Sequence, residues 1–394
     1  MSSHVDTVVI GGGLLGCATA WMLAQEGGSI LLAERDQINQ HASGQNAGSL
    51  HFQLEYRMME HGVEAAKKAA EAMPLHLEAA ELWQGIADAS GEEIEVTQTG
   101  GLMLAESAKQ ARILERKVAI EQGWGLDVRM LDQREVQSVA PYLTENIVAA
   151  AFCPVEGKAD TRTAGPALAR AAIREGASVE TRTEVVNIRR DGRRWRLTLR
   201  TDAGERDVFS DAVVIAAGVW TTEIGKLIGV DLPTIAVALQ MTVSLKVPKF
   251  IDHLVQHAGE RLSLKQSLDG NVLIGGGWPA KLPHTAGGAP DFSKKPKLLQ
   301  SSLAGNARVA SRVVPQVAEI PMLRSWSGVT TVTPDQLPLV GPVPNAPGVF
   351  VATGGSAFTL GPSFARVLTE LVAGKTPTTD LSSFDPMRYG KGDV

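Results

Sequence analysis

Residues 5–35 read VDTVVIGGGLLGCATAWMLAQEGGSILLAER, and this stretch decides the fold. An apolar, β-branched run predicts a strand over 5–10, and apolar residues at helical spacing predict a helix over 14–25. A further apolar run predicts a second strand over 29–33. Strand, helix and strand in this order form a βαβ unit, which is typical of α/β folds with a parallel sheet.

The turn between the first strand and the helix carries Gly11-x-Gly13-x-x-Gly16, and Glu34 ends the second strand. Gly11 allows a tight turn, Gly13 lets a pyrophosphate approach the backbone, and Gly16 lets the helix pack closely on the strand. An acid in the place of Glu34 accepts hydrogen bonds from a ribose. The unit predicts dinucleotide binding, and the alternative is a glycine-rich turn that binds nothing. Glu34 disfavours a dinucleotide with a 2′-phosphate on its ribose, but Arg35 beside it leaves such a ligand possible.

The same stretch has no charged residue between Asp6 and Glu26, which raises the alternative of a membrane span or a signal peptide. A signal peptide would carry Lys or Arg before the apolar run, where this chain has Asp6. Three consecutive glycines, Gly11 to Gly13, would break a spanning helix. We therefore expect a buried strand, turn and helix, and no membrane span.

Composition narrows the class of protein. The chain has 394 residues, with 38 Lys and Arg against 43 Asp and Glu, and a formal net charge of −5. This charge disfavours nucleic acid as a partner, and the arginines near residue 190 are explained by a solvated hairpin. Only two cysteines, Cys17 and Cys153, are present, which predicts a reducing, cytoplasmic location. No metal-binding motif is present, so we expect no metal site.

Residues 43–48 read SGQNAG, a run of small and polar residues. Such a run supplies backbone donors and little bulk, as a loop against a phosphate or a flavin ring requires. An ordinary surface loop has the same composition. The segment on its own leaves both interpretations open.

Together, the glycine fingerprint, Glu34-Arg35 and Ser43-Gly44-x-Asn46-Ala47-Gly48 resemble the D-amino-acid oxidase/sarcosine oxidase superfamily of FAD-dependent enzymes. The resemblance implies an α/β fold in which a Rossmann-like FAD-binding domain is interleaved with a smaller mixed α+β substrate domain. The expected FAD-binding domain comprises 1–84, 150–231 and 324–386, the substrate domain 85–149 and 232–323, and a flexible tail 387–394.

The resemblance extends to a β-meander over 183–215 and to a C-terminal return to the flavin over 324–355. The segment after Gly361-Pro362 predicts a helix whose N-terminus faces the flavin, with a plain packing helix as the alternative. The cofactor contacts implied are Gly11, Gly13, Leu14, Leu15, Gly16, Glu34, Arg35, Ser43, Gly44, Gln45, Asn46, Ala47, Gly48, Val185, Ala216, Ala217, Gly218, Trp220, Gly341, Gly354, Gly355, Thr359 and Leu360.

The chemistry implied by the resemblance is transfer of a hydride from the Cα–H of an amine or amino acid to flavin N5, which leaves an imine that water hydrolyses. Arg324 is the expected cation for the substrate carboxylate, with a structural salt bridge as the alternative. His51 is a candidate substrate contact, or a helix-starting residue paired with Glu55. Trp326 and Phe358 are the expected pocket walls.

Three departures from the sarcosine oxidase pattern refine the expectation. Residues 327–331 contain no cysteine, so FAD should be bound non-covalently. Residues 272–274 contain no lysine where those enzymes activate oxygen, which favours a dehydrogenase. Lys158-Ala159-Asp160 resembles a site of covalent FMN attachment, and Ala159 forbids the link but leaves room for FMN bound at a subunit interface.

The segment from Ser43 to His51 and the lack of an oxygen-activating lysine look most like the β subunits of heteromeric opine oxidases, for octopine or nopaline, or of hydroxyproline dehydrogenases. Such a subunit oxidises a secondary-amine amino acid, and an α subunit with further redox centres passes the electrons on. Two alternatives remain: a stand-alone FAD-dependent D-amino-acid dehydrogenase or oxidase, and a flavin-binding subunit without catalysis.

Overall fold

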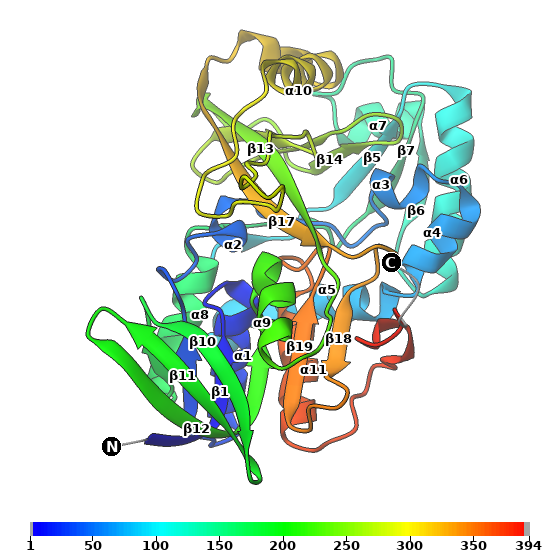
Figure 1. The fold of residues 1–394 in the computed structure, drawn as a ribbon. Coiled ribbons are helices and arrows are strands. Elements are labelled where there is room, and N and C mark those ends of the chain that lie inside the picture. The colour runs from blue at the N-terminus through cyan, green and yellow to red at the C-terminus, as the bar shows by residue number, and fades with distance from the viewer. Residues whose placement is uncertain (1–2, 390–394) are drawn as a thin grey trace.

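The computed structural model describes residues 3–389, which form two lobes built around separate sheets (Figure 1). Each of the two main sheets has eight strands, and a third sheet has three. The first described strand, β1, lies in the lower lobe of Figure 1. The mixed α/β architecture agrees with the fold class expected from the sequence.

The first sheet contains the predicted βαβ unit, because β1 pairs in parallel with both β2 and β12. Its strands are β10 (Glu184–Asp191), β11 (Arg194–Thr201), β12 (Gly204–Ile215), β1 (Ser3–Ile10), β2 (Ile30–Ala33) and β9 (Ser178–Glu180) in spatial order, with β19 (Val349–Thr353) beside β12 and β18 (Leu339–Pro342) beside β19. Three separate segments of the chain therefore build this sheet, and the chain returns to it twice.

Helix α1 (Leu14–Gln25) is buried along almost its whole length, so it reads as an apolar run without a polar face. It packs between α8 (Ala164–Arg174) and α11 (Gly361–Val372). A Cβ on Gly16 would lie 1.8 Å from the Gly11 carbonyl oxygen, so only glycine allows the helix to approach the turn this closely.

The predicted meander is confirmed, with β10, β11 and β12 joined by tight turns. Its last strand is longer than expected. β12 runs from residue 204 to 215 and pairs first with β11 and then with β1 and β19, because its two halves serve different neighbours.

The second sheet forms the upper lobe of Figure 1. Its strands are β17 (Met322–Val332), β13 (Ile235–Lys246), β16 (Asn271–Gly275), β15 (Ser263–Gln266), β14 (Leu254–His257), β5 (Gly101–Ala105), β7 (Ala149–Cys153) and β6 (Arg129–Asp132) in spatial order. Both β7 and β17 pair only with strands of this sheet, although the boundaries expected at 150 and 324 place them with the cofactor domain. The substrate sheet therefore extends further along the chain at both boundaries, because pairing and not apolar content decides which sheet a strand joins.

The third sheet is small and consists of β3 (Ser49–Leu50), β8 (Gly157–Ala159) and β4 (Val96–Thr97). Each strand comes from a different part of the chain, so the sheet holds residues 49–50 against 157–159. This pairing places the segment after the SGQNAG run beside the second sheet, where Ser49 reaches Ser263 of β15.

The remaining helices connect the sheets or cover their faces. They are α2 (Ala42–Gln45), α3 (Tyr56–Met59), α4 (Val63–Ala70), α5 (Met73–Ser90), α6 (Ala108–Gly123), α7 (Gln133–Val139), α9 (Thr221–Leu227) and α10 (Gln300–Val313), with 3₁₀ turns at Gly218–Trp220, Pro315–Glu319 and Ser382–Phe384. Within residues 3–389, no helix is long and apolar enough to cross a membrane.

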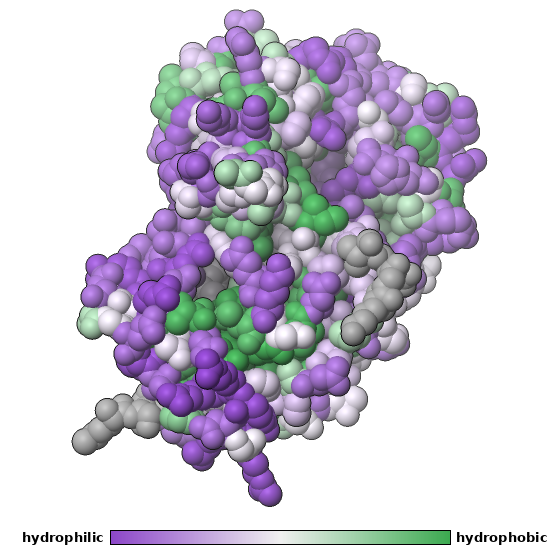
Figure 2. Space-filling view, viewed as in Figure 1, coloured by the Kyte–Doolittle hydropathy of each residue, from purple (hydrophilic) through white to green (hydrophobic). Residues whose placement is uncertain are grey.

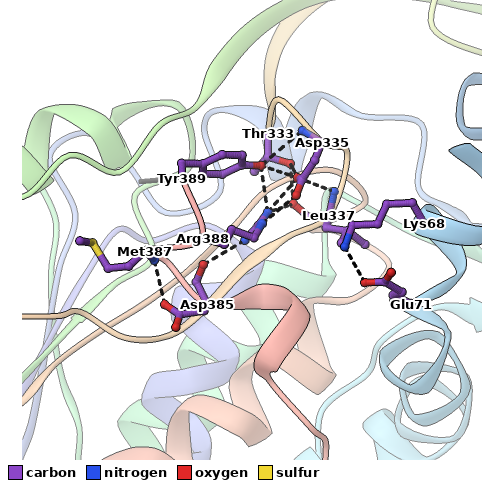
Figure 3. Close-up of polar contacts among 9 residues, drawn as sticks. All are labelled: Lys68, Glu71, Thr333, Asp335, Leu337, Asp385, Met387, Arg388 and Tyr389. Atoms are coloured by element: carbon purple, nitrogen blue, oxygen red, sulfur yellow. Dashed lines mark hydrogen bonds and ion pairs between the residues drawn. The ribbon is translucent and has the colours of Figure 1, made fainter. Parts of the chain in front are cut away.

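The end of the described chain is held by side-chain contacts. Arg388 donates to both carboxylate oxygens of Asp335, at 2.7 and 2.9 Å, and Tyr389 also bonds to this carboxylate (Figure 3). Residues 387–389, which we expected to begin a flexible tail, are therefore anchored to the loop before β18. The rest of that tail, 390–394, lies outside the described residues.

Candidate active site

A single cavity of about 920 Å³ runs between the two main sheets. It begins at the turn between β1 and α1 and reaches the ends of β14, β15 and β16 in the other lobe. Figure 2 shows apolar surface in the middle of this face, between lobes whose outer ends are mainly hydrophilic. A cavity shared by two sheets suits a long ligand bound by one lobe and a substrate bound by the other.

The glycine turn forms the first end of the cavity. Gly11 has a φ of +109°, and a Cβ there would meet the Ala216 carbonyl oxygen at 2.5 Å. A Cβ on Gly13 would lie 2.9 Å from Ser43 Oγ, which in turn accepts the Leu14 N–H at 3.0 Å. Gly13 therefore allows Ser43 to pack closely on the turn, and both residues line the cavity with bare backbone of the kind that a pyrophosphate requires.

Glu34 closes this end of the cavity. Its Oε2 accepts the Gly12 N–H at 2.6 Å and its Oε1 accepts the Asp36 N–H at 2.7 Å. The side chain is 8% exposed and lines the cavity, so each carboxylate oxygen keeps a further lone pair for a ribose hydroxyl. Asp36 and His41 lie close to Glu34 and could with it hold a metal ion, but backbone N–H groups and a 2.7 Å hydrogen bond between His41 and Asp36 already engage these groups.

An aromatic platform lies beside Glu34. The Arg35 guanidinium sits 4.3 Å from the ring centre of Trp220, and His41 approaches the same ring edge-on at 4.8 Å. Val185 lines the cavity nearby. A flat ring and a guanidinium around an apolar recess suit an adenine.

Most of the residues expected to contact a cofactor do line the cavity. They are Gly11, Gly13, Leu15, Glu34, Arg35, Ser43, Gln45, Asn46, Ala47, Val185, Ala216, Ala217, Gly218, Trp220, Gly354, Gly355 and Thr359. Six others lie outside it: Leu14, Gly16, Gly44, Gly48, Gly341 and Leu360.

Those six residues shape the walls or pack elsewhere. A Cβ on Gly44 would meet the Asn39 carbonyl oxygen at 2.1 Å, and one on Gly48 would meet that of Ala159 at 2.0 Å, so both serve close backbone packing. Leu14 and Leu360 are buried in the core. Gly341 does not line the cavity, and a Cβ there would meet Pro386 at 3.2 Å, so the structure does not place it in contact with the cofactor site.

The loop before α11 forms a further wall. Thr359 Oγ1 donates to the Ser49 carbonyl at 3.2 Å, and its own carbonyl accepts Trp83 Nε1 at 2.7 Å. Phe358 lines the cavity, as expected, and stacks on Trp83. Pro362 stands in the first turn of α11, so the N–H end of this helix points toward the loop that lines the cavity.

Taken together, the turn, Glu34, the aromatic platform and the α11 loop fit a dinucleotide that carries a flavin. The bare glycine turn suits phosphates, and the polar atoms of the lining residues include buried Thr331 Oγ1, which has no hydrogen-bond partner among the described residues. Buried polar groups are normally paired, so an unpaired one facing a cavity indicates a missing ligand or water.

The far end of the cavity is polar. His51 lines it, with Nε2 3.2 Å from Ser263 Oγ and a buried Nδ1 that has no partner within the described residues. Burial lowers the pKa of His51 to about 4, with the Glu55 carboxylate opposing the shift. His51 lies in an irregular segment before α3, so the alternative of a helix-starting residue is wrong.

Glu55 and Arg57 form an ion pair beside His51. The distance from Arg57 Nη2 to Glu55 Oε1 is 2.9 Å, and Ser356 Oγ donates to the same oxygen at 3.0 Å. The charge of Arg57 and the hydrogen bonds from Arg57 and Ser356 hold the pKa of Glu55 low, at about 2, although burial raises it. The pair is neutral overall, so neither group is a free charge for a ligand.

Arg324 and Trp326 do not reach the cavity. Arg324 is exposed on β17 and stacks over Trp326, whose Nε1 donates to the Gln45 carbonyl at 2.7 Å. Neither lines the cavity, so the expected roles as carboxylate anchor and pocket wall are wrong. Beyond residue 327, β17 crosses from the exposed edge to the cavity and lines it with Gly328 to Val332.

A different arginine stands at the cavity, on the turn between β14 and β15. Arg261 lines the mouth and has no acidic partner among the described residues. His257 Nδ1 accepts the N–H groups of Gly259 and Glu260, both at 3.0 Å, and the Arg261 carbonyl accepts Trp278 Nε1 at 2.9 Å. Hydrogen bonds thus hold the turn on both sides of Arg261, whose guanidinium has no acidic partner in the described part of the chain. Nothing in the local sequence distinguishes Arg261 from an ordinary surface arginine.

Lys265 is the second residue that the sequence did not point to. Apolar and polar residues alternate in the stretch Leu262-Ser263-Leu264-Lys265, as in a strand with one solvent-exposed face. This pattern predicts an exposed lysine. All four residues are buried, because the sheet is covered on both faces here. Lys265 lies opposite Leu273 in the pairing of β15 with β16. It is therefore on the strand next to residues 272–274, where sarcosine oxidases carry their oxygen-activating lysine.

Comparisons with known proteins also indicate an FAD-dependent enzyme. The family model described as FAD dependent oxidoreductase (DAO) matches residues 6–371. The chain is 28% identical to glycine oxidase of Geobacillus kaustophilus, over 99% of this chain and 98% of that protein. It is 25% identical to an opine oxidase subunit of Rhizobium meliloti, over 98% of each. The crystal structure of the Geobacillus glycine oxidase superposes with a TM-score of 0.85, at 25% identity, covering 98% of this chain and all of that one.

Proposed function

The chain belongs to the DAO family of FAD-dependent oxidoreductases, and from that premise we propose that it oxidises a secondary-amine amino acid of the opine, sarcosine or hydroxyproline type. It is an FAD-dependent amino-acid oxidoreductase, the family that the sequence motifs predicted. In the proposal it acts as the catalytic β subunit of a heteromeric dehydrogenase in the cytoplasm.

One observation carries the proposal of an amino-acid substrate: the cavity that begins at the dinucleotide turn is also lined by Arg261, an exposed guanidinium without an acidic partner among residues 3–389. A guanidinium binds a carboxylate through two parallel hydrogen bonds. His51 lines the same cavity and offers a neutral ring nitrogen for an amine. Arg261 thus replaces Arg324 as the proposed carboxylate anchor, and His51 is the proposed amine contact.

Bound FAD would supply the hydride acceptor for the substrate Cα–H. The chain would hold it with the Gly11–Gly13 turn at the pyrophosphate and with Glu34 at the ribose. The N-terminus of α11 would lie toward the end that gains negative charge on reduction and would stabilise it electrostatically.

We propose that FAD is bound without a covalent link. Residues 327–331 contain no cysteine. Cys17 and Cys153 are buried away from the cavity, and burial raises the pKa of both thiols. Neither thiol is placed or ionised for attachment to a flavin.

The heteromeric role rests on the likeness to the opine oxidase subunit of Rhizobium meliloti over nearly the whole chain. An α subunit with further redox centres would take the electrons, and FMN, if present, would lie at the interface between the two chains. Co-purification of the tagged chain from its native cells, followed by identification of flavins and partner chains, tests this part.

A stand-alone oxidase is the second candidate, favoured by the full-length likeness to glycine oxidase and by the buried amine of Lys265 beside the site. The two candidates differ in oxygen use. A dehydrogenase reduced anaerobically should reoxidise slowly in air and release little peroxide, whereas an oxidase should release one peroxide per substrate.

Anaerobic titration of the holoenzyme with sarcosine, hydroxyproline, proline, octopine, nopaline and D-amino acids tests the central proposal. Bleaching of the flavin band by a secondary-amine amino acid supports it. Bleaching by primary D-amino acids alone would favour the stand-alone alternative, and no bleaching at all would favour a flavin-binding subunit without catalysis.

A further inference from the structure

The geometry points to a proton relay, in which Lys265 takes up, through Ser49 and Ser263, the proton that His51 removes from the substrate amine. This inference rests on the proposed oxidation of an amine and adds the fate of its proton. His51 would touch the substrate, whereas Lys265 and the two serines would act through it.

Four side chains form one continuous hydrogen-bonded chain. His51 Nε2 lies 3.2 Å from Ser263 Oγ, Ser263 Oγ lies 2.9 Å from Ser49 Oγ, and Lys265 Nζ is hydrogen-bonded to Ser49 Oγ. Ser263 and Lys265 are two residues apart on β15 and so share one face of the sheet. Ser49 reaches them from β3, because the third sheet holds that strand against the second lobe.

The two ends of the chain differ in what surrounds them. His51 lines the cavity, and its buried Nδ1 has no hydrogen-bond partner within the described residues. Lys265 is 3% exposed, and no carboxylate pairs with it among residues 3–389. A chain that begins at a cavity-lining histidine with an unpaired ring nitrogen and ends at an unpaired amine in the interior can carry a proton from one end to the other.

Burial and the neighbouring charges lower the pKa of both ends of the chain. Burial lowers the pKa of Lys265 well below the ordinary lysine value, and the Lys158 ammonium of β8 adds to this shift. Around His51 the charged or titratable groups are Glu55, Arg57, His76 and Lys265 itself, and burial dominates all of them. Lys265 Nζ donates to Ser49 Oγ in the structure. Once the amine has lost its proton it can also accept a hydrogen bond from Ser49, which a lysine ammonium cannot do.

Each transfer along the relay moves one proton. The substrate ammonium gives its proton to His51 Nδ1, while the hydrogen on Nε2 passes to Ser263 Oγ. The Ser263 hydrogen passes to Ser49 Oγ, and the Ser49 hydrogen passes to Lys265 Nζ, which becomes an ammonium. The substrate keeps the nitrogen lone pair that departure of the Cα hydride requires. After the product leaves, the reverse shift brings the proton back to His51, which releases it to water entering the cavity.

A purely structural chain would hold β3 against β15 and leave no pH signature. Lys265→Met removes the amine and keeps a side chain of similar length, and Lys265→Arg keeps a donor to Ser49 that stays protonated. Ser263→Ala cuts the chain and leaves the amine in place. Ser325→Ala is the matched control, because Ser325 forms a comparable hydroxyl pair with Thr242 in the same sheet, 2.9 Å apart.

The first measurement is the pH dependence of flavin reduction, followed anaerobically by stopped flow. In the wild type the rate should rise with pH as Lys265 loses its proton. In Lys265→Met, Lys265→Arg and Ser263→Ala this rise should disappear and the rate should fall by about 10²-fold, the contribution of a general base. Lys158→Met should move the rise to higher pH, because it removes the like charge, and Ser325→Ala should change nothing.

The second measurement is independent of catalysis. In protein labelled with ¹³C-lysine, one side-chain signal should titrate well below the ordinary lysine pKa of about 10.4 and be missing from Lys265→Met. Titration of Lys265 at the ordinary value overturns the relay, and so does a wild-type pH profile in Lys265→Met or Ser263→Ala. If no amine bleaches the wild-type flavin, the proposed function fails and the relay falls with it, whereas bleaching with an unchanged profile overturns the relay alone.

Discussion

Glu34 Oε2 accepts the backbone N–H of Gly12 at 2.6 Å, so the acid at the end of β2 braces the glycine turn at the end of β1. Its other oxygen accepts the Asp36 N–H. The side chain that would bind the ribose therefore also shapes the turn that would bind the pyrophosphate. A change at Glu34 acts on both ends of the ADP portion.

Glu34→Ala should weaken FAD binding by about 10- to 100-fold, because it removes a charged acceptor and leaves the Gly12 N–H unpaired. Fluorescence titration of the apoprotein with FAD measures the dissociation constant. Glu180→Ala is the control, since Glu180 on β9 pairs with exposed Arg206 and lies outside the cavity. Equal affinity in Glu34→Ala and Glu180→Ala would contradict the assignment.

Gly13→Ala should abolish retention of FAD through purification, because a Cβ there would lie 2.9 Å from Ser43 Oγ and would displace a loop that lines the cavity. Gly85→Ala provides the matched change, since Gly85 lies in α5 with no atom within 4 Å of an added Cβ. That variant should keep its FAD and gain up to about 1 kcal/mol of stability from helix propensity. The flavin-to-protein absorbance ratio and the melting temperature report both outcomes.

Arg261→Met should raise the substrate dissociation constant by about 10²-fold, since charge-assisted hydrogen bonds are worth about 1.5–3 kcal/mol each and the carboxylate accepts two. Arg324→Met should leave binding unchanged, because Arg324 is exposed over Trp326 and does not line the cavity. Anaerobic titration of flavin bleaching against substrate concentration separates the two variants. A larger effect of the change at Arg324 than of the change at Arg261 would show that Arg324, on β17, binds the substrate carboxylate.

Denaturation in acid or guanidinium followed by ultrafiltration should release all of the flavin, because neither Cys17 nor Cys153 reaches the cavity. Mass spectrometry of the intact chain should show the polypeptide mass alone. Flavin retained on the precipitated chain would show a covalent link through another residue.

A buried carboxylate predicts a pH-dependent contribution to stability. Glu156 is fully buried, and burial raises its pKa to about 7, while the N–H groups of Phe52 and Gln53 and the Lys117 ammonium oppose the shift. Because the folded-state pKa lies above the unfolded one, the folded chain holds this proton more tightly, and that stability is lost as pH rises through about 7.

The melting temperature of the wild type should therefore fall, relative to Glu156→Gln, between about pH 5 and pH 8. Calorimetry of both proteins across this range measures the difference. A constant difference in melting temperature would show that Glu156 keeps one protonation state throughout. Since Glu156 holds the backbone at Phe52 and Gln53, the same change also tests how firmly His51 is positioned.

The sequence predicted the parts of the site that depend on local backbone. Gly11, Gly13 and Glu34 could be recognised because a tight turn and a ribose contact require these residue types at this spacing. Arg324 could not be separated from Arg261 in this way, because both are single arginines near a strand end and their roles depend on where β17 leaves the cavity. Lys265 was missed because its alternating strand predicts a wet face that the second lobe covers.

By itself, the sequence determined the βαβ unit, the cofactor class and the family, since short-range spacing carries the glycine turn and its acid. Only the tertiary structure decided which strands join the second sheet, which arginine faces the cavity, and that Ser49, Ser263, His51 and Lys265 form one chain. The physical reason is the distance along the chain. These contacts join residues about two hundred positions apart. Sheet pairing and burial bring such residues together, and the sequence around each residue gives no sign of it.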